Sequence, residues 1–189
     1  MLVASRPHAL LATVRSRCFQ IGFAAMEPDA LAAELRRLGI DEGGRRAALS
    51  DGRPGRALTL DVVREGQRRD AVLDMMVRLA SSPRGAIELG ANAAALSGEG
   101  EDDLVEGIEL VAALARDAAR IGSGHAEVLH ADASPRLAEL SRVLDPATAV
   151  EIVALASRLR SDLRINANRT LVAETLLAAV AGVIPERAF

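Results

Sequence analysis

The chain has 189 residues, of which 50% are apolar and 26% charged, and its formal net charge is −3. So high an apolar content excludes a disordered chain. Three Phe and no Tyr or Trp exclude the aromatic platforms on which single-stranded nucleic acid stacks. The slight acidity provides no overall basic field for holding duplex DNA. Because 37 residues are Ala and Leu is also frequent, the composition predicts a mainly α-helical protein.

Cysteine content and hydropathy bear on location. The one cysteine, Cys18, cannot form an internal disulfide or any of the usual zinc spacings, which fits a reducing compartment. No apolar run approaches the ~18 residues that a bilayer span requires. The first residues also lack the length of apolar sequence typical of a secretory signal. We therefore expect a soluble cytoplasmic protein with no membrane partner and no metal.

The first residues have a pattern unlike the rest. A short apolar run at 2–4 is followed by one or two predicted helical turns from His8 to Val14. Residues 18–23 then alternate in the period of a half-buried strand, with Phe19, Ile21 and Phe23 on one side. Two short strands cannot form a stable sheet by themselves. Residues 1–24 are therefore interpreted as the edge of a larger α/β domain.

From Met26 the apolar period becomes helical. Three short helices are predicted over residues 26–63, the first closed by Gly39 and the third opened by Pro54. A fourth, connecting helix is predicted over 68–81. Turn-forming residues cluster at 81–85, so residues 25–82 are predicted to form the second domain.

The remainder has the pattern of a helical bundle. Helices are predicted over 85–97, 101–121, 134–144, 147–164 and 168–183, with a long loop over 124–133. Asp145 followed by Pro146 is a typical start of the fourth of these helices. Residues 83–189 are therefore predicted to form a third, helical domain.

Few side chains suggest autonomous chemistry. Cys18 could act as a nucleophile only with a paired base, and no local signature joins it to a histidine. A loop cluster of His125, Glu127, His130 and Asp132 could chelate a metal, but its spacing favours a solvated loop. The sequence contains no phosphate-binding loop, G-x-S-x-G or H-E-x-x-H motif. We expect no independent catalysis from this chain.

Two short stretches contain less ordinary combinations of residues. Arg15 and Arg17, within Thr13-Val14-Arg15-Ser16-Arg17-Cys18, place two guanidinium groups at the predicted helix–strand junction. Farther along, a turn containing Gly52, Pro54, Gly55 and Arg56 opens a helix. Taken singly, the first is consistent with surface charge and the second with an ordinary turn.

Taken together, these stretches carry a family resemblance. Residues 10–18 resemble the L-L-x-T-[IVL]-R-S-R-C segment of the delta-prime family of clamp-loader subunits in bacterial DNA polymerase III, which are AAA+ proteins. Residues 49–60 resemble that family's L-S-x-G-x-P-G-x-A-L-x-L turn. Residues 165–177 resemble its terminal [IL]-N-x-N-x-x-L-x-x-[ED]-x-L-L helix. Three motifs in the same order make this resemblance far more specific than any one of them.

The resemblance implies a layout and a mechanism. Residues 1–24 would be a two-strand remnant of the AAA+ core, 25–82 a three-helix lid with its connector, and 83–189 the collar through which subunits form a ring. In such rings an arginine matching Arg17 acts in trans as a finger on ATP bound by the neighbouring subunit, with Arg15, Ser16 and Cys18 as its supporting motif. The family's zinc cluster and degenerate phosphate loop lie upstream of these motifs, so the chain resembles only the C-terminal portion of a subunit.

The implied partners follow from that layout. The collar would contact the gamma/tau and delta subunits, and the assembled loader would engage the sliding clamp and primer–template DNA. The chain would thus be a non-catalytic part of a DNA-directed DNA polymerase, a nucleotidyltransferase. The slot of the ATP-sensing arginine aligns with Gly55, although a shift by one residue would place Arg56 there. The alternatives are an ATP-hydrolysing AAA+ ring subunit reduced to lid and collar, and an unrelated helical module.

Overall fold

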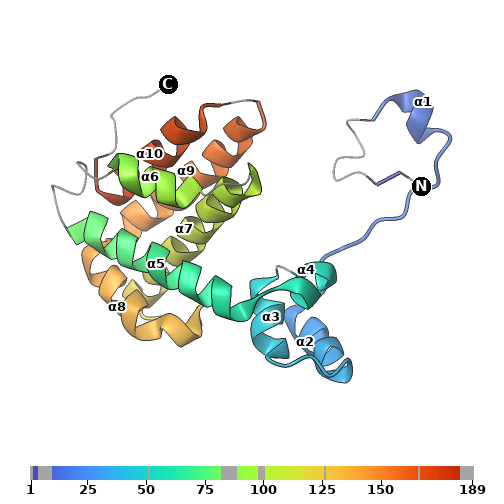
Figure 1. Cartoon of the computed structure of the whole chain (residues 1–189), viewed down its shortest axis with the longest axis horizontal. Helices are drawn as coiled ribbons and strands as arrows, with labels where there is room; N and C mark the ends of the chain where they lie inside the picture. Colours follow the sequence, from blue (N-terminus) through green and yellow to red (C-terminus); the bar gives the residue numbers. More distant parts are fainter. Residues whose placement is uncertain are drawn as a thin grey trace. The chain divides into compact units, whose positions relative to one another are not determined.

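The computed structural model describes residues 2–3, 10–50, 52–81, 89–97, 101–125, 127–165 and 167–183. Within these ranges the chain forms ten α-helices, one short 3-10 helix and no strand (Figure 1). The predicted mainly α-helical class is therefore confirmed. The chain divides into two compact units, Met1–Leu60 and Asp61–Phe189.

The first unit begins with a segment that has almost no regular structure. Helix α1 (Ala12–Arg15) is a single turn with no buried residue. The predicted strand over 18–23 is wrong for these residues, as is a strand at residues 2–3. A strand exists only when a neighbour completes its hydrogen bonds, and no backbone N–H of residues 19–25 bonds to a described residue. Residue 4, the last of the short apolar run, lies outside the described residues, and so do residues 8–9 of the predicted helical turns.

Three short helices form the folded part of the first unit. They are α2 (Pro28–Arg37), α3 (Gly43–Leu49) and α4 (Pro54–Thr59), as the sequence predicted. Proline opens α2 and α4, where its missing N–H costs no helical hydrogen bond. Gly39 ends α2 in the left-handed region, with φ of +72°, which confirms the predicted cap. The core of these helices contains Leu31, Leu35, Ala47 and Ala57, with Met26, Ala32 and Ile40 packed against it.

Arg46 ties α3 to the end of α4. Its Nη1 donates to the carbonyl oxygens of Ala57 at 3.1 Å and Leu60 at 2.8 Å, and its Nε donates to that of Asp41 at 3.0 Å. Carbonyl groups at a helix C-terminus have no partner within the helix. The guanidinium therefore satisfies groups that the short α4 leaves open and stabilises the three-helix packing.

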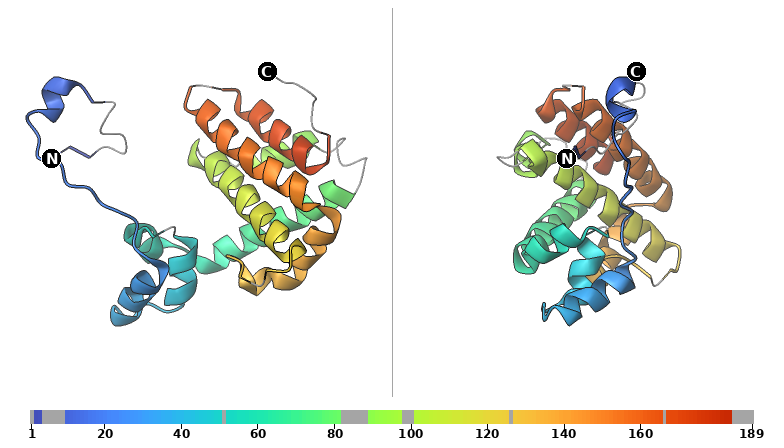
Figure 2. Two further views of the ribbon diagram at one scale, coloured as in Figure 1. Left: turned by 180° about the vertical axis from the view of Figure 1, so that it is seen from behind. Right: turned by 90° about the vertical axis from the view of Figure 1, so that its right-hand side faces the viewer.

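The second unit is a bundle of six α-helices. They are α5 (Val62–Ser81), α6 (Leu89–Ser97), α7 (Glu101–Gly122), α8 (Ser134–Val143), α9 (Pro146–Leu163) and α10 (Arg169–Val180), with a 3-10 helix at Ala131–Ala133 before α8. Helices α7, α9 and α10 lie side by side (Figure 2). Asp145 caps α9 as predicted, accepting from the N–H groups of Ala147 and Thr148. One continuous core joins all six helices.

Helix α5 differs from the prediction in both its start and its packing. It begins at Val62 rather than near residue 68, and Asp61 caps it by accepting from the N–H groups of Val63 and Arg64. Gly66 does not interrupt it, because packing of the apolar face outweighs glycine's ~1 kcal/mol penalty within a helix. Helix α5 packs on α7, α8 and α10, so the division between the units falls before it. The boundary predicted around residue 83 lies outside the described residues.

Among the described residues, four arginines make ion pairs between elements of the bundle, and one of these pairs joins Arg136 on α8 to Asp74 on α5. Arg68 on α5 and Arg160 on α9 each pair with a glutamate of α7 at 2.8 Å, and Arg69 on α5 pairs with Asp132 of the 3-10 helix at 2.7 Å. Across the described part of the chain, none of the helices combines the length and apolar character needed to cross a membrane.

Candidate functional site

The turn after α1 presents the four residues of the predicted arginine-finger motif. Its backbone is closed by N–H groups of Arg17 and Cys18, which donate to the carbonyl oxygens of Val14 and Arg15 at 3.2 Å. The Ser16 hydroxyl donates to the carbonyl oxygen of Thr13, also at 3.2 Å. The local hydrogen bonds therefore define a turn although its residues are all exposed.

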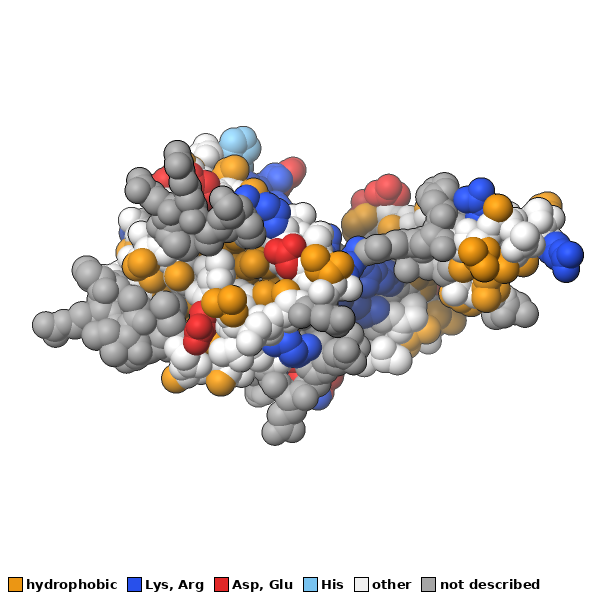
Figure 3. Space-filling model, turned by 90° about the horizontal axis from the view of Figure 1, so that it is seen from above, with side chains coloured by type: hydrophobic (Ala, Val, Ile, Leu, Met, Phe, Trp, Pro, Cys, Tyr) orange, Lys and Arg blue, Asp and Glu red, His pale blue; other side chains and the backbone are white. Residues whose placement is uncertain are grey.

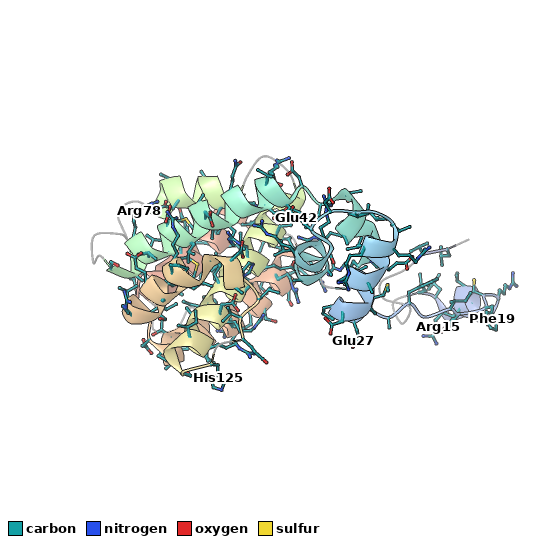
Figure 4. The ribbon with its side chains drawn as sticks, turned by 90° about the horizontal axis from the view of Figure 1, so that it is seen from below. Arg15, Phe19, Glu27, Glu42, Arg78 and His125 are labelled. Atoms are coloured by element: carbon teal, nitrogen blue, oxygen red, sulfur yellow. The ribbon has the colours of Figure 1, made fainter. Side chains whose placement is uncertain are left out.

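The side chains of this turn face solvent. Arg15, Ser16, Arg17 and Cys18 are all exposed, and neither guanidinium forms an ion pair with a described residue. Figure 4 shows Arg15 and Phe19 on the narrow segment that precedes α2. Apolar and basic side chains lie together on its surface (Figure 3), and Phe19 and Phe23 are 92% and 93% exposed. The segment thus presents several exposed apolar groups and two guanidinium groups that form no ion pair with a described residue.

The predicted lid turn has a tightly packed glycine at its centre. Gly52 is buried, has φ of +68°, and accepts a hydrogen bond from the N–H of Met26 at 2.9 Å. A Cβ atom at Gly52 would lie 2.4 Å from the carbonyl oxygen of Met26. Only glycine fits both this backbone conformation and this close approach.

The other residues of that turn are less constrained. Arg53 and Pro54 are exposed, Arg56 is half-buried, and nothing lies within 4 Å of a Cβ built on Gly55. No hydrogen bond or ion pair between described residues joins these side chains to Arg15, Ser16, Arg17 or Cys18. The chain that follows the Arg15–Cys18 turn meets the lid turn at Met26, whose N–H donates to the Gly52 carbonyl oxygen.

The terminal motif has a structural role that the resemblance did not specify. Asn168 is the N-cap of α10, its side-chain oxygen accepting from the N–H of Leu171 at 3.2 Å. Leu176 and Leu177 are fully buried in the bundle core, whereas Leu171 is exposed. Asn166 lies outside the described residues.

The loop between α7 and α8 is joined to α7 by a buried histidine–carboxylate hydrogen bond that sequence reasoning missed. His130, expected in a solvated loop, is only 3% exposed, and its Nδ1 lies 2.9 Å from Oδ2 of Asp117 on α7. The carboxylate of Asp117 also accepts from the N–H groups of Leu129 and His130, both at 3.0 Å. The available signal was Asp117, a carboxylate among apolar residues of a predicted helix, because a buried carboxylate requires a hydrogen-bond partner.

These hydrogen bonds alter the acidity of Asp117. Burial raises the pKa of its carboxyl group, but the hydrogen bonds from the His130 side chain and from the two backbone N–H groups together outweigh that effect. The net result is a pKa lower than the usual value of 3.8. The carboxylate is therefore held in its charged form and anchors the loop to α7.

The four loop residues weighed as metal ligands have different surroundings in the structure. Asp132 is paired with Arg69, Glu127 lies 3.6 Å from Arg120, and His130 is paired with Asp117. Across the described residues, no group of three or more His, Cys, Asp or Glu side chains is arranged to hold a metal ion. The four loop residues that might have formed one instead have separate partners or, as with His125, face solvent (Figure 4).

A shallow open groove of about 380 Å³ lies between α7 and α9 in the second unit. Its lining is mostly apolar and includes Arg116 and Arg120 on α7 and His125 just beyond that helix. The lining residues are Arg116, Ala119, Arg120, Ser123, His125, Ala149, Val150 and Val153. The groove is thus an open, mostly apolar depression with two arginines in its lining rather than an enclosed catalytic cavity.

Comparison with known proteins identifies no family. No protein-family model matches the chain, and no curated protein matches its sequence. The case for function therefore depends on the three motifs and on the geometry of the residues within them.

Proposed function

We propose that this chain is a non-catalytic subunit of a bacterial clamp loader, of the delta-prime type, that supplies Arg17 as an arginine finger to a neighbouring subunit. The observation that carries the proposal is the state of Arg17: it is exposed, it lies within a hydrogen-bonded turn, and it makes no ion pair with a described residue. A finger acting in trans requires a guanidinium that its own subunit has not neutralised.

The two units support the assignment in different ways. The three helices of the first unit are consistent with a lid, and the helical bundle of the second with a collar that assembles on gamma/tau and delta subunits. The sliding clamp and primer–template DNA would be bound by the assembled ring, because the chain itself has a net charge of −3. We place this assembly in the cytoplasm, within the DNA polymerase III holoenzyme.

The proposed chemistry occurs on ATP held by the neighbour. Water attacks the γ-phosphorus atom, the bond to the β–γ bridging oxygen breaks, and negative charge develops on the transferred group and leaving oxygen. Arg17 would place its planar, permanently charged guanidinium against that charge. The present chain would bind no ATP itself, in agreement with a glycine, Gly55, at the slot of the sensing arginine.

The test is Arg17→Lys in the assembled complex. Lysine keeps the charge but not the bidentate geometry, so we expect DNA-stimulated ATP hydrolysis by the partner to fall ~10³-fold or more while assembly is retained. Arg36→Lys, at another exposed arginine of the same unit, is the matched control and should leave turnover unchanged. Undiminished turnover in the Arg17 variant would refute the assignment.

A further inference from the structure

The groove in the second unit follows α7 and α9, which lie side by side and run in opposite directions (Figure 2). Glu109 in the first half of α7 pairs with Arg160 near the end of α9 at 2.8 Å. A Cβ built on Gly122, at the end of α7, would lie 3.7 Å from Pro146 at the start of α9. Between these contacts the α7 side of the groove is lined by residues 116–123. At 1.5 Å per residue that length is roughly 10 Å, which matches about two turns of a docked helix.

Apolar side chains of α9 remain uncovered in this groove. Val150 is 64% exposed, although Ile152 and Ala156 of the same helix are buried in the bundle core. Val153 and Ala119, which also line the groove, are half-buried. A partner that covered these side chains would remove apolar surface from water, which is the main driving force for association between proteins.

Two arginines give the groove a local positive charge in a chain whose net charge is −3. Arg116 and Arg120 are four residues apart on α7, so their side chains lie on one face of the helix, one turn apart. Arg116 is exposed and makes no ion pair with a described residue. Arg120 lies 3.6 Å from Glu127, whose side chain is 95% exposed, and solvent leaves so exposed a pair little stabilising energy. Since none of the described lining residues is Asp or Glu, both guanidinium groups can pair with carboxylates of a partner.

We propose that the groove between α7 and α9 binds an acidic amphipathic helix of a partner protein. Aliphatic side chains of that helix, spaced three or four residues apart, cover Val150 and Val153, as in other cases where a helix lies in an apolar groove. Two of its carboxylates, one helical turn apart, pair with Arg116 and Arg120 and set its register and direction. The inference goes beyond the proposed function and does not depend on Arg17, which belongs to the other unit.

The test measures binding of a synthetic helical peptide to the full chain by fluorescence anisotropy. The peptide carries Leu at positions i, i+3, i+4 and i+7, two Glu one turn apart beside that stripe, Ala and Gln elsewhere, and a terminal fluorophore. A control peptide has Gln in place of the two Glu. We expect saturable binding of the acidic peptide and at least ~tenfold weaker binding of the Gln peptide, because the latter cannot pair with the arginines.

Variants of the chain distinguish direct pairing from a general attraction of opposite charges. Arg116→Gln and Arg120→Gln should each weaken binding of the acidic peptide about three- to tenfold and leave the affinity for the Gln peptide unchanged. Val150→Glu should weaken binding of the acidic peptide at least ~tenfold, because it places a like charge among the apolar contacts. Since Val150 is exposed, this variant should keep the circular dichroism spectrum of the parent. Arg158→Gln, at an exposed arginine of α9 outside the groove lining, is the matched control and should bind as the parent does.

Three results would overturn the inference. They are no saturable binding of the acidic peptide, equal affinities for the Glu and Gln peptides, and a loss of affinity in the Arg158 variant as large as in the Arg116 and Arg120 variants. Dimerisation of the parent chain that Val150→Glu abolishes, seen by analytical ultracentrifugation without peptide binding, would overturn it too and assign the groove to a second copy of this chain. None of these measurements involves ATP turnover, so their failure and the failure of the Arg17 assignment are distinguishable.

Discussion

The segment of residues 10–25 and the six-helix second unit contrast in nearly every physical respect. The bundle buries a continuous apolar core and pairs arginines across its helices, whereas the segment exposes Phe19, Ile21 and Phe23 and has one helical turn. Yet the segment carries the proposed functional arginine. Stability and function are thus assigned to different parts of the chain, since a group that must act on another subunit cannot be packed within its own.

The strongest test of this difference is to truncate one large apolar side chain in each region and compare the loss of stability. Leu114 on α7 is fully buried, so Leu114→Ala should reduce the free energy of unfolding of the second unit by about 2–5 kcal/mol. Phe19→Ala should change the free energy of unfolding of the first unit by less than ~0.5 kcal/mol, because Phe19 is 92% exposed and has few contacts to lose. Urea denaturation followed by circular dichroism measures both. A large loss in the Phe19 variant would show that the segment is packed in solution.

A second prediction concerns the buried hydrogen bond between Asp117 and His130. Asp117→Asn should destabilise the second unit by about 3 kcal/mol, since it removes a charge that satisfies three donors. The folded-state pKa of Asp117 is lowered, so its contribution is complete above the unfolded value of 3.8 and is lost as pH falls through the folded value.

The pH dependence provides the corresponding measurement. When the pH is lowered from 6 to below about 4, the parent chain should lose more unfolding free energy than the Asn variant. Denaturation curves recorded at a series of pH values would show this as a steeper slope for the parent. Parallel slopes would mean that Asp117 has the same pKa in the folded and unfolded chains.

A smaller loss of stability than in the bundle is expected for the three helices of the first unit. Arg46→Ala removes three hydrogen bonds to carbonyl oxygens, so the three-helix unit should lose about 1–2 kcal/mol of unfolding free energy. Arg37→Ala, which removes only an exposed ion pair with Glu34, should produce no measurable change. Thermal denaturation resolves the two, and equal melting curves would show that Arg46 does not stabilise α4.

The sequence predicted features that depend on neighbouring residues better than features that depend on tertiary contacts. Local signals worked: Gly39 ended a helix, Pro54 opened one, and Asp145 capped another. The strand at 18–23 failed because alternation describes a backbone that could pair, whereas pairing itself depends on a neighbour. The start of α5 failed because Gly66 and its polar neighbours weakened a helical pattern that tertiary packing restores.

The candidate site was predictable to a similar extent. Exposure of Arg17 followed from its place at the end of a short helix, and the importance of Gly52 could be anticipated from a glycine-rich turn. The approach of Met26 to Gly52 could not, because the two residues are far apart in sequence and their contact is created by packing of α2, α3 and α4. The Asp117–His130 pair was missed for the same reason.

Cys18 offers a labelling site from which binding of the proposed partner could be observed. The sequence contains a single thiol, which is exposed and directly adjacent to Arg17 in the chain. A maleimide fluorophore would attach there without prior removal of competing cysteines. Changes in its emission would then report whether the neighbourhood of the guanidinium becomes covered when a nucleotide-loaded partner arrives.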